Sequence, residues 1–341
     1  ADFDYDEGLV LSHAEEEVIF SDAINMGSLR ESVLVHADDY GIKNIDILFP
    51  EAKNYNDEPY YIQRDTEWVK SVLGKTAKSP FTRIKTTAAD ITEKEARAKG
   101  YIKGTRKKEE VFKVLKRVTT PTTVYKKQKL DRDDILDITS LNIVSFLKKE
   151  MRVMINEEIA RAILFGDGRE IGDPDKINED NIRPICKDDV IFTTKVEVEK
   201  SQFVNPQAFV EDIIKSRKLY KGTGKPTLFI SQDILTDILL IKDTTNRYIY
   251  DTLDSLKTKL RVDEIVEVPL IDEFEEKENK KLVAVMVNLD DYVIGADKGG
   301  ELSMFDDFDI DYNQEKYLME TRLSGALVKP KSAVVFEMKT A

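Results

Sequence analysis

One continuous stretch, residues 126–169, constrains the fold more than any other part of the chain. It reads KKQKLDRDDILDITSLNIVSFLKKEMRVMINEEIARAILFGDGR. Its apolar residues recur every three or four positions, the spacing of one helical face. We therefore predict an amphipathic helix of about 25 residues, or roughly 40 Å at ~1.5 Å per residue. The predicted face consists of Leu141, Val144, Leu147, Met151, Met154, Ile155, Ile159, Ala162 and Ile163.

The ends of this helix also carry signals. Thr139 or Ser140 can cap its start, and Asp137 suits the positive end of the helix dipole. Gly166 and Gly168 provide the stop. The same pattern is found in core helices of many globular proteins, so the helix predicts a structural spine without indicating a function.

Composition restricts the class of protein. The chain has 341 residues, of which 34% are charged and 41% hydrophobic, so we expect a globular protein with two or three sub-domains. The longest apolar runs, residues 282–289 and 234–241, are too short or too interrupted to cross a bilayer, and the opening residues ADFDYDEG predict no signal peptide. Cys186 is the sole cysteine, which excludes an intrachain disulfide and fits a reducing cytoplasm.

The charge is distributed unevenly along the chain, whose net charge is −13. Residues 1–70 hold 17 acidic and 5 basic residues, whereas residues 75–130 hold 5 acidic and 17 basic residues. A nucleic-acid-binding arm is one interpretation of the basic segment. Its few aromatic residues, the lack of zinc-ligand spacing and the acidic remainder favour another interpretation, a basic loop that lies on an acidic surface of another copy. A solvated charged hairpin remains the plainest alternative.

The coarse pattern predicts an α+β fold without βαβ repeats. Alternation at residues 111–118 suggests long strands within the basic segment, with a tip near Gly100 and Gly104. Such a two-stranded loop has no core of its own and needs a partner surface. After the long helix we predict strands at 192–198, 227–230, 262–270, 281–287, 305–312, 316–328 and 333–338, and helices from Pro206 towards Gly222 and from a Ser231 cap to Ile241.

Candidate chemical sites are few. Asp131, Asp133, Asp134 and Asp137 could form a carboxylate cluster, but acids before a helix are favoured for capping. Asp307, Asp309 and Asp311 alternate with Phe308, Ile310 and Tyr312; Tyr312 stands where a calcium loop needs glycine, so a half-buried strand with an acidic outer face is the better interpretation.

The remaining candidates do not build a catalytic site either. Gly166-Asp167-Gly168 lacks the Lys-Ser/Thr of a phosphate loop and follows a helix. The sole histidines, His13 and His36, lie in the N-terminal segment, which argues against Ser-His-Asp and multi-histidine metal sites. Cys186 has no neighbouring base in the sequence. We predict no catalytic residue, no metal and no cofactor.

Three stretches together resemble the major capsid (coat) protein family of tailed bacteriophages, which has the Hong Kong-type capsid fold. The first is the end of the long helix, EMRVMINEEIARAILFGDGR, and the second is FISQDILTDILLIKDTTNRYIY at residues 229–250. The third is YLMETRLSGALVKPKSAVVF at residues 317–336, with its Glu-x-Arg and late Pro-x-x-Ala. The order and spacing of these pieces cover about residues 75–341, and residues 1–74 match only loosely.

The resemblance implies a division of the chain. Residues 1–74 would be an N-terminal arm and residues 75–130 an extended β-hairpin loop laid over a neighbouring subunit. Residues 131–200, with the spine helix, and residues 301–341 would form a peripheral domain, and residues 201–300 an axial domain. The implied function is that of a major capsid protein that assembles into pentamers and hexamers and encloses phage DNA in an icosahedral head. The basic residues expected to contact the neighbouring copy are Lys99, Lys103, Arg106, Lys107, Lys108, Lys113 and Arg117.

Some members of that family form a Lys–Asn isopeptide bond between subunits, helped by a glutamate. Asn313 and Glu320 occupy the matching places here, but Thr105 stands at the ungapped lysine position. The lysines nearby are Lys103, Lys107 and Lys108. Cross-linking is therefore the less favoured hypothesis, and non-covalent packing or a separate glue protein is the alternative.

The resemblance also implies partners: copies of the same chain, scaffolding, portal and decoration proteins, and double-stranded DNA bound without sequence specificity. It places the protein in the virion capsid, assembled in the bacterial host cytoplasm. An encapsulin-type nanocompartment shares the fold and would hold protein cargo instead. A soluble enzyme with an acidic site is the second alternative, and would require a deep pocket in a monomer or small oligomer.

Overall fold

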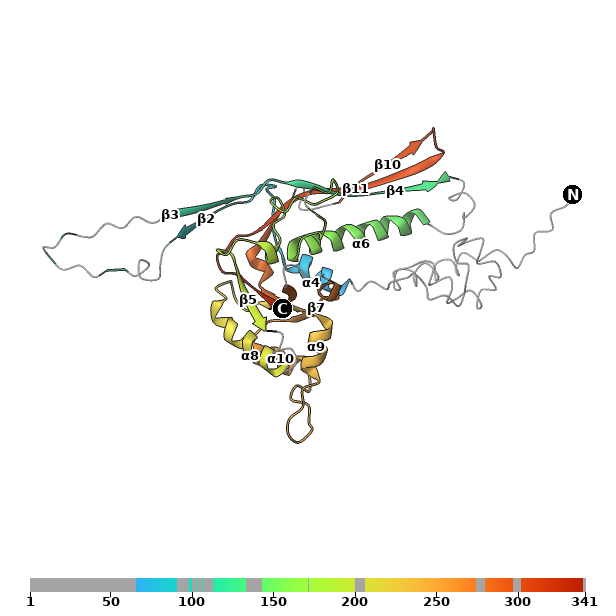
Figure 1. Cartoon of the computed structure of the whole chain (residues 1–341). Helices are drawn as coiled ribbons and strands as arrows, with labels where there is room; N and C mark the ends of the chain where they lie inside the picture. Colours follow the sequence, from blue (N-terminus) through green and yellow to red (C-terminus); the bar gives the residue numbers. More distant parts are fainter. Residues whose placement is uncertain are drawn as a thin grey trace. The chain divides into compact units, whose positions relative to one another are not determined.

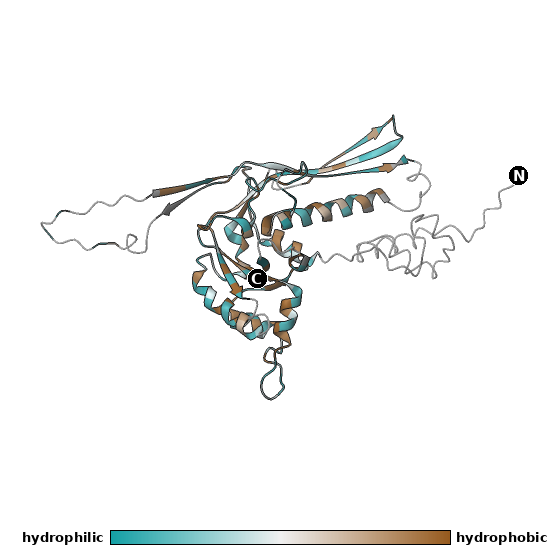
Figure 2. Ribbon diagram, viewed as in Figure 1, coloured by the Kyte–Doolittle hydropathy of each residue, from teal (hydrophilic) through white to brown (hydrophobic). Residues whose placement is uncertain are grey.

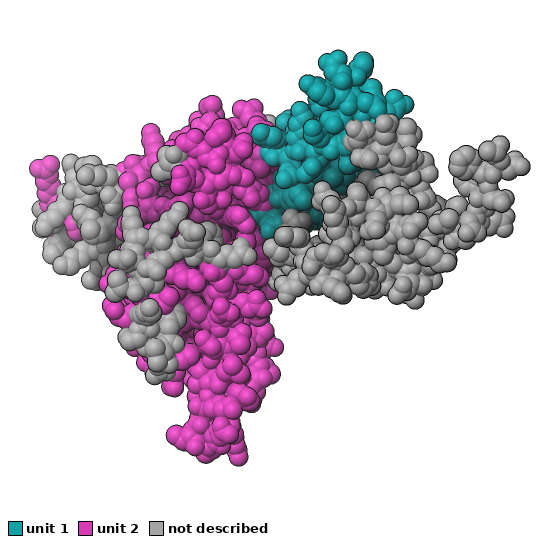
Figure 3. Space-filling view, turned by 45° about the vertical axis from the view of Figure 1, so that its right-hand side comes forward, with its two compact units in different colours: residues 1–66, 125–157, 302–320 teal, residues 67–124, 158–301, 321–341 magenta. Residues whose placement is uncertain are grey.

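The computed structural model describes residues 66–90, 98–99, 103, 106, 113–132, 143–170, 172–199, 206–273, 280–296 and 302–339 (Figure 1). The chain forms two compact units (Figure 3). Unit 1 contains residues 1–66, 125–157 and 302–320, and unit 2 contains residues 67–124, 158–301 and 321–341. Residues 1–65 of the predicted N-terminal arm, the predicted helix start and the carboxylates at Asp133, Asp134 and Asp137 lie outside the described residues.

A five-stranded mixed sheet forms the centre of unit 2. Its strands are β5 (Thr193–Glu199), β6 (Thr227–Ile230), β7 (Ile265–Glu267), β8 (Lys280–Val287) and β12 (Ala333–Lys339), in the order β5-β12-β8-β6-β7. β12 is parallel to β5 and antiparallel to β8, so the C-terminal strand joins pieces of chain more than 80 positions apart. β6 and the last five residues of β8 are buried throughout, as their continuous apolar sequences predict.

Three helices cover one face of this sheet: α8 (Pro206–Ser216), α9 (Gln232–Leu239) and α10 (Leu253–Leu260). Polar and apolar residues alternate around α8 and α9 (Figure 2), and their apolar sides meet the sheet in one core. The rings of Phe209 on α8 and Phe336 on β12 pack edge to face, with centroids 5.9 Å apart. The Ser231 side chain accepts a hydrogen bond from the Ile234 N–H, which confirms the predicted cap.

A second sheet has the order β1-β9-β11-β10, with β4 also paired to β11. Its strands are β1 (Ala77–Ser79), β4 (Thr122–Asp131), β9 (Tyr292–Ala296), β10 (Ser303–Asp309) and β11 (Gln314–Leu327). β10 and β11 form an antiparallel hairpin in unit 1 that pairs Ser303 with Glu320 and Asp309 with Gln314. The last residues of β11 pair with β9 in unit 2, so β11 belongs to both units.

The predicted spine helix is α6 (Ile143–Leu164), 22 residues long. Met151, Ile155 and Ile159 are buried, which confirms the central part of the predicted face. Residues 162–167 are all buried, so the end of the helix is buried all round, whereas an amphipathic helix buries only one face. The Gly166 N–H donates to the Arg161 carbonyl at 3.0 Å, and Gly166 has a φ of 89°, the left-handed conformation expected of a glycine stop.

The remaining elements are short. They are α4 (Glu67–Lys75), α11 (Leu270–Glu273), and the 3₁₀ turns η1 (Ile185–Lys187), η2 (Arg217–Leu219) and η3 (Leu289–Asp291). A separate hairpin pairs β2 (Lys85–Asp90) with β3 (Lys113–Val118). None of the described helices is long and apolar enough to cross a membrane.

Candidate assembly surfaces

The basic loop predicted at residues 75–130 contains the antiparallel pair β2–β3, in which Lys85 faces Val118 and Asp90 faces Lys113 (Figure 1). The described residues between these strands, Lys99, Lys103 and Arg106 among them, are exposed. Lys107, Lys108 and the side chain of Lys113 lie outside the described part. On β3 the apolar side chains of Val114 and Val118 are also exposed, at 53% and 52%. The hairpin therefore presents both cations and apolar groups to solvent.

Arg117, the last predicted contact residue on β3, is instead turned into its own chain. Its Nη2 donates to Asp188 Oδ1 at 2.6 Å and its Nη1 to the Leu327 carbonyl at 3.0 Å. The guanidinium also lies over the Phe192 ring, 4.0 Å from the centroid. Both ionic side chains are almost fully buried, at 6% and 1% exposure. Arg117 therefore fixes the root of the hairpin, and we exclude it from the contact surface proposed below.

Hydroxyl groups form a second set of hydrogen bonds at the base of the hairpin. Thr119 Oγ1 donates to Ser324 Oγ at 2.9 Å and accepts from the Ile84 N–H at 3.1 Å. Ser324 Oγ in turn donates to the Thr82 carbonyl. At Gly295 a Cβ atom would lie 2.4 Å from the Phe81 carbonyl oxygen, so the backbones approach as closely as glycine allows. These hydrogen bonds hold the base of the exposed hairpin against the rest of unit 2.

The β10–β11 hairpin of unit 1 presents an acidic and aromatic surface. Asp306, Asp307 and Asp311 are exposed, while Asp309 is bonded to Lys316, which holds the pKa of Asp309 below its ordinary value. Large apolar side chains beside these carboxylates are exposed as well, namely Phe305, Phe308, Ile310 and Tyr312.

The exposure of these apolar side chains contradicts the burial that we predicted from the alternating sequence. We predicted a half-buried strand with only its acids outside, but β10 ends at Asp309, and Ile310 and Tyr312 lie in the turn that follows, 84% and 71% exposed.

The cross-link candidates of this hairpin do not meet within the chain. Asn313 lies exposed in the turn before β11, and its carbonyl accepts from the Arg132 N–H at 3.0 Å. Glu320 is partly buried and lies six positions after Gln314 along the strand. At ~3.3 Å per residue the strand from Gln314, the neighbour of Asn313, to Glu320 spans roughly 20 Å, so Glu320 cannot assist Asn313 of the same chain.

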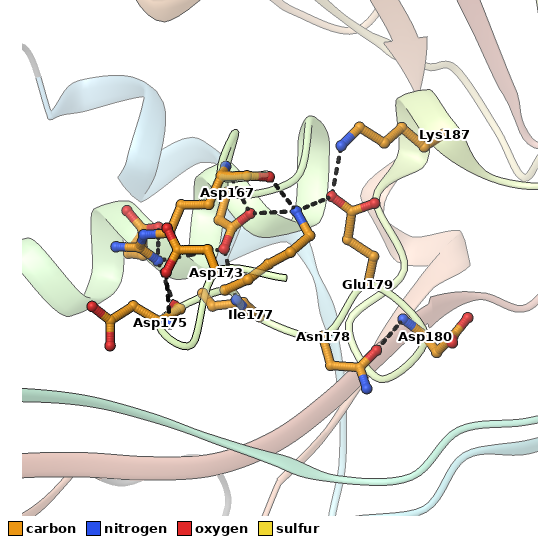
Figure 4. Close-up of polar contacts among 11 residues, drawn as sticks. Asp167, Asp173, Asp175, Ile177, Asn178, Glu179, Asp180 and Lys187 are labelled. Carbon is orange, nitrogen blue, oxygen red and sulfur yellow. Dashed lines mark hydrogen bonds and ion pairs between the residues drawn. The ribbon is translucent and has the colours of Figure 1, made fainter. Parts of the chain in front are cut away.

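The Gly-Asp-Gly stop after α6 is the centre of a second polar network (Figure 4). Asp167 is fully buried and accepts from the Ile177 N–H at 2.6 Å, from Lys176 Nζ at 3.1 Å and from the Arg169 N–H at 3.2 Å. Burial alone would raise the pKa of Asp167, but the Ile177 and Lys176 hydrogen bonds outweigh burial and lower it. Lys176 and Lys187 both also bind Glu179, which ties the loop to η1.

Replacing Asp167 by asparagine is expected to destabilise the protein by about 2–3 kcal/mol, because the Lys176 ammonium loses its buried anionic partner. The folded-state pKa of Asp167 is depressed, so its contribution is present above about pH 4 and is lost as the pH falls through the folded value. Chemical denaturation of both proteins between pH 3 and pH 7 measures this. Equal losses of stability on acidification in the two proteins would contradict the role given to Asp167.

The other candidates have no chemical partner. Cys186 is buried and burial raises the pKa of its thiol, so it is unreactive. No group of three or more His, Cys, Asp or Glu side chains in the described part of the chain could hold a metal ion. Asp131 ends strand β4, and its predicted companions lie outside the described residues. The sequence pattern identified Gly166-Asp167-Gly168 by its glycines and did not indicate that Asp167 would hold the following loop by hydrogen bonds. No pattern in the sequence marked Asp188.

One comparison identifies a family for this chain. The model of the phage capsid family matches residues 69–338. A search of curated proteins finds no match.

Solved structures with the same fold include the capsid of a native GTA particle, with a TM-score of 0.61 at 11% identity, covering 84% of this chain and 94% of that chain. A Mycobacterium phage Ogopogo chain has a TM-score of 0.56 at 10% identity, covering 79% and 91%. A virus-like particle from Pyrococcus furiosus has a TM-score of 0.50 at 13% identity, covering 79% and 94%. At these identities the structures establish the fold, which is the predicted Hong Kong-type α+β capsid fold.

Proposed function

We propose that this chain, which belongs to the phage capsid family, assembles first into pentamers and hexamers. It is a major capsid protein, a structural subunit of an icosahedral phage head and not an enzyme. The family match over residues 69–338 carries this proposal. Heterologous contacts use two different surfaces of each copy. They generate a closed ring when the rotation that relates neighbouring copies divides a full turn. The basic and the acidic hairpin are two such surfaces of opposite charge.

We expect the basic hairpin of one copy to lie on the acidic hairpin of the next. The first offers Lys99, Lys103 and Arg106 with exposed Val114 and Val118. The second, β10–β11, offers exposed aspartates beside exposed Phe, Ile and Tyr side chains. Opposite charges select the register of the contact, and the apolar groups supply buried area. Lys107, Lys108 and Lys113 would extend the cationic side.

The predicted division of the chain accords with this assembly. Residues 1–74 would act as an arm, residues 75–130 as the loop, residues 131–200 and 301–341 as the peripheral domain, and residues 201–300 as the axial domain at the ring centre. The core of α8, α9 and α10 on the five-stranded sheet supports a compact axial domain, but β5 and β12 belong to the same sheet, so residues 193–199 and 333–339 of the proposed peripheral segments pack with it.

We expect the shell to be held together without covalent bonds, and denatured shells to run on a gel as 39.0 kDa monomers. Because Asn313 precedes β11 and Glu320 lies six residues into that strand, a Lys–Asn bond would need the glutamate of another copy. A ladder of multiples of the monomer mass would contradict this. In that case, Lys103→Arg, Lys107→Arg and Lys108→Arg, changed singly, would identify the lysine.

The cargo is what distinguishes a phage head from an encapsulin-type nanocompartment. We propose double-stranded DNA, bound without sequence specificity, with scaffolding, portal and decoration proteins as further partners. Particles purified from infected or lysogenic host cells, treated with nuclease and then extracted, should yield protected DNA of uniform length. Particles that contain a co-purifying enzyme and no protected DNA would support the nanocompartment instead.

A further inference from the structure

A small cavity lies within unit 2, between the base of the β2–β3 hairpin and the segment that precedes β5. Its lining comes from residues 86 and 115–118 of the hairpin and from within residues 183–192. Its volume is about 300 Å³, which is the lower end of the range for small-molecule sites. We call it the hairpin cavity. Its size restricts it to a small ligand.

Two guanidinium groups that line the hairpin cavity, those of Arg117 and Arg183, carry unused hydrogen-bond donors. The Nε of each is buried and bonds to no described residue. Arg117 uses its two Nη atoms on Asp188 and on the Leu327 carbonyl, and its side chain is only 6% exposed. Arg183 Nη1 lies 3.7 Å from Asp189 Oδ2, a weak ion pair. Because buried donors are nearly always satisfied in folded proteins, these groups indicate a partner that accepts hydrogen bonds.

The charges around the cavity leave one positive charge in excess. The lining carries three cations, Lys116, Arg117 and Arg183, and one carboxylate, Asp189. Asp188 is bonded to Arg117 and is counted as well. Three cations against two carboxylates leave a net charge of +1. The side chain of Asp189 is 67% exposed, so water screens its charge and the balance stays positive.

Neighbouring charges do not reverse this balance. Lys331 Nζ donates to the Val190 carbonyl, which places a further cation beside the segment that precedes β5. Lys187 is paired with Glu179, so these two cancel. An excess of one charge fits a monoanion. A phosphate monoester, with about −1.5 to −2 charges at pH 7, would remain partly unneutralised.

The rest of the lining is apolar apart from the Thr86 hydroxyl. Its apolar residues are Leu115, Val118, Ile191 and Phe192. Val118 and Ile191 are 52% and 43% exposed, so a ligand can still remove apolar surface from water here. Burial of that surface stabilises a ligand with an apolar body, whereas an inorganic anion gains nothing from it.

We infer that the hairpin cavity binds a small organic monocarboxylate with an aliphatic or aromatic body. The carboxylate takes the free N–H groups of Arg117 and Arg183, since guanidinium groups match carboxylate oxygens in geometry and charge. The body lies against the four apolar side chains. Such a ligand contacts β3 and the segment before β5 at once, so it holds the base of the hairpin to unit 2. This site does not depend on the assembly proposals.

Calorimetric titration of the purified chain tests the ligand class. Benzoate and hexanoate are the probes. Benzamide, which keeps the ring without the charge, and inorganic phosphate, which keeps charge without an apolar body, are the controls. We expect one probe molecule per chain, bound about tenfold or more tightly than either control. Equal binding of benzamide or of phosphate would overturn the inference, as would the failure of both probes to bind.

The variant Arg183→Met separates the site from general stickiness. The backbone of Arg183 bonds to Gly325 and Tyr292, and the substitution leaves those bonds in place. We expect benzoate binding to weaken about tenfold, and Arg183→Lys to lose less because it keeps the charge. Arg247→Met, at an exposed arginine between α9 and α10, should bind as the wild type does. Normal binding by folded Arg183→Met protein would contradict the site.

Lys116→Glu is an independent variant at an exposed position, so the test does not rest on one substitution. It changes the net charge of the cavity by two units, from +1 to −1. We expect benzoate binding to weaken by about tenfold or more. Binding that stays unchanged in this variant would show that charge at the cavity does not hold the ligand.

Hydrogen exchange locates the bound probe. Saturating benzoate should slow exchange of the amides of residues 114–118 and 183–192, because the ligand joins these two segments. The amides of α8 should exchange at the same rate with and without benzoate. Protection that is absent from the two segments, or strongest elsewhere, would place the ligand outside the hairpin cavity and overturn the inference.

Discussion

Replacing Arg117 by alanine is expected to cost about 3–5 kcal/mol of folding free energy, a large part of the total stability of a typical domain. The change leaves the Asp188 carboxylate, 1% exposed, without its cation, and leaves the Leu327 carbonyl without its donor. It also removes the group that lies over Phe192. Because these contacts join β3 to the body of unit 2, we expect loss of soluble protein and of shells.

Two controls separate this effect from a general sensitivity of the strand. Lys116→Ala, at the exposed neighbouring position, should change stability by less than about 0.5 kcal/mol. The double variant Arg117→Met with Asp188→Leu removes both charges and should recover most of the loss. Chemical denaturation of the soluble proteins measures each value. An Arg117→Ala protein as stable as the wild type would show that the ion pair does not fix the hairpin.

Reversing the charge of the basic hairpin should abolish shell formation and leave the chain folded. The variant K99E/K103E/R106E changes three exposed side chains. In the proposed contact it would place negative charge opposite Asp306, Asp307 and Asp311 of the neighbouring copy. Like charges across a contact are strongly unfavourable, and each copy would repeat the repulsion around the ring. Sedimentation velocity should detect monomers where the wild type forms shells.

The charge-retaining variant K99R/K103R/R106K should still assemble, since it keeps every charge in place. Combining the reversed loop with D306K/D307K/D311K should restore assembly, because the two surfaces again carry opposite charge. If the reversed loop alone assembled normally, or if the combination failed while both single sets remained folded, the hairpin-to-hairpin contact would be wrong.

Local signals in the sequence predicted most of the helices and strands between residues 206 and 287. The apolar run at 227–230 became β6, Pro206 begins α8, and Ser231 caps α9. The strand predicted at 262–270 shortened to Ile265–Glu267, because Pro269 lacks an N–H and begins the turn that leads into α11. These features depend on neighbours within a few residues, which a sequence pattern records.

Such sequence patterns do not predict the contacts that hold the candidate surfaces in place. Arg117 and Asp188 are 71 positions apart, and nothing in the spacing of either residue marks it as buried. Arg117 therefore looked like the other cations of its segment. The exposure of Phe305 and Phe308 was missed for a related reason: alternation predicts which residues share a face, but the partner that covers that face is another part of the structure. The resemblance to capsid proteins supplied the assembly, which no single residue indicated.

The most direct measurement is a cryo-electron microscopy reconstruction of the particles that this chain forms. We predict a closed icosahedral shell with pentamers and hexamers, in which the loop between β2 and β3 of one copy lies against β10 and β11 of its neighbour. Open or small oligomers, or a closed shell whose loops touch no neighbouring copy, would contradict the assembly proposed here.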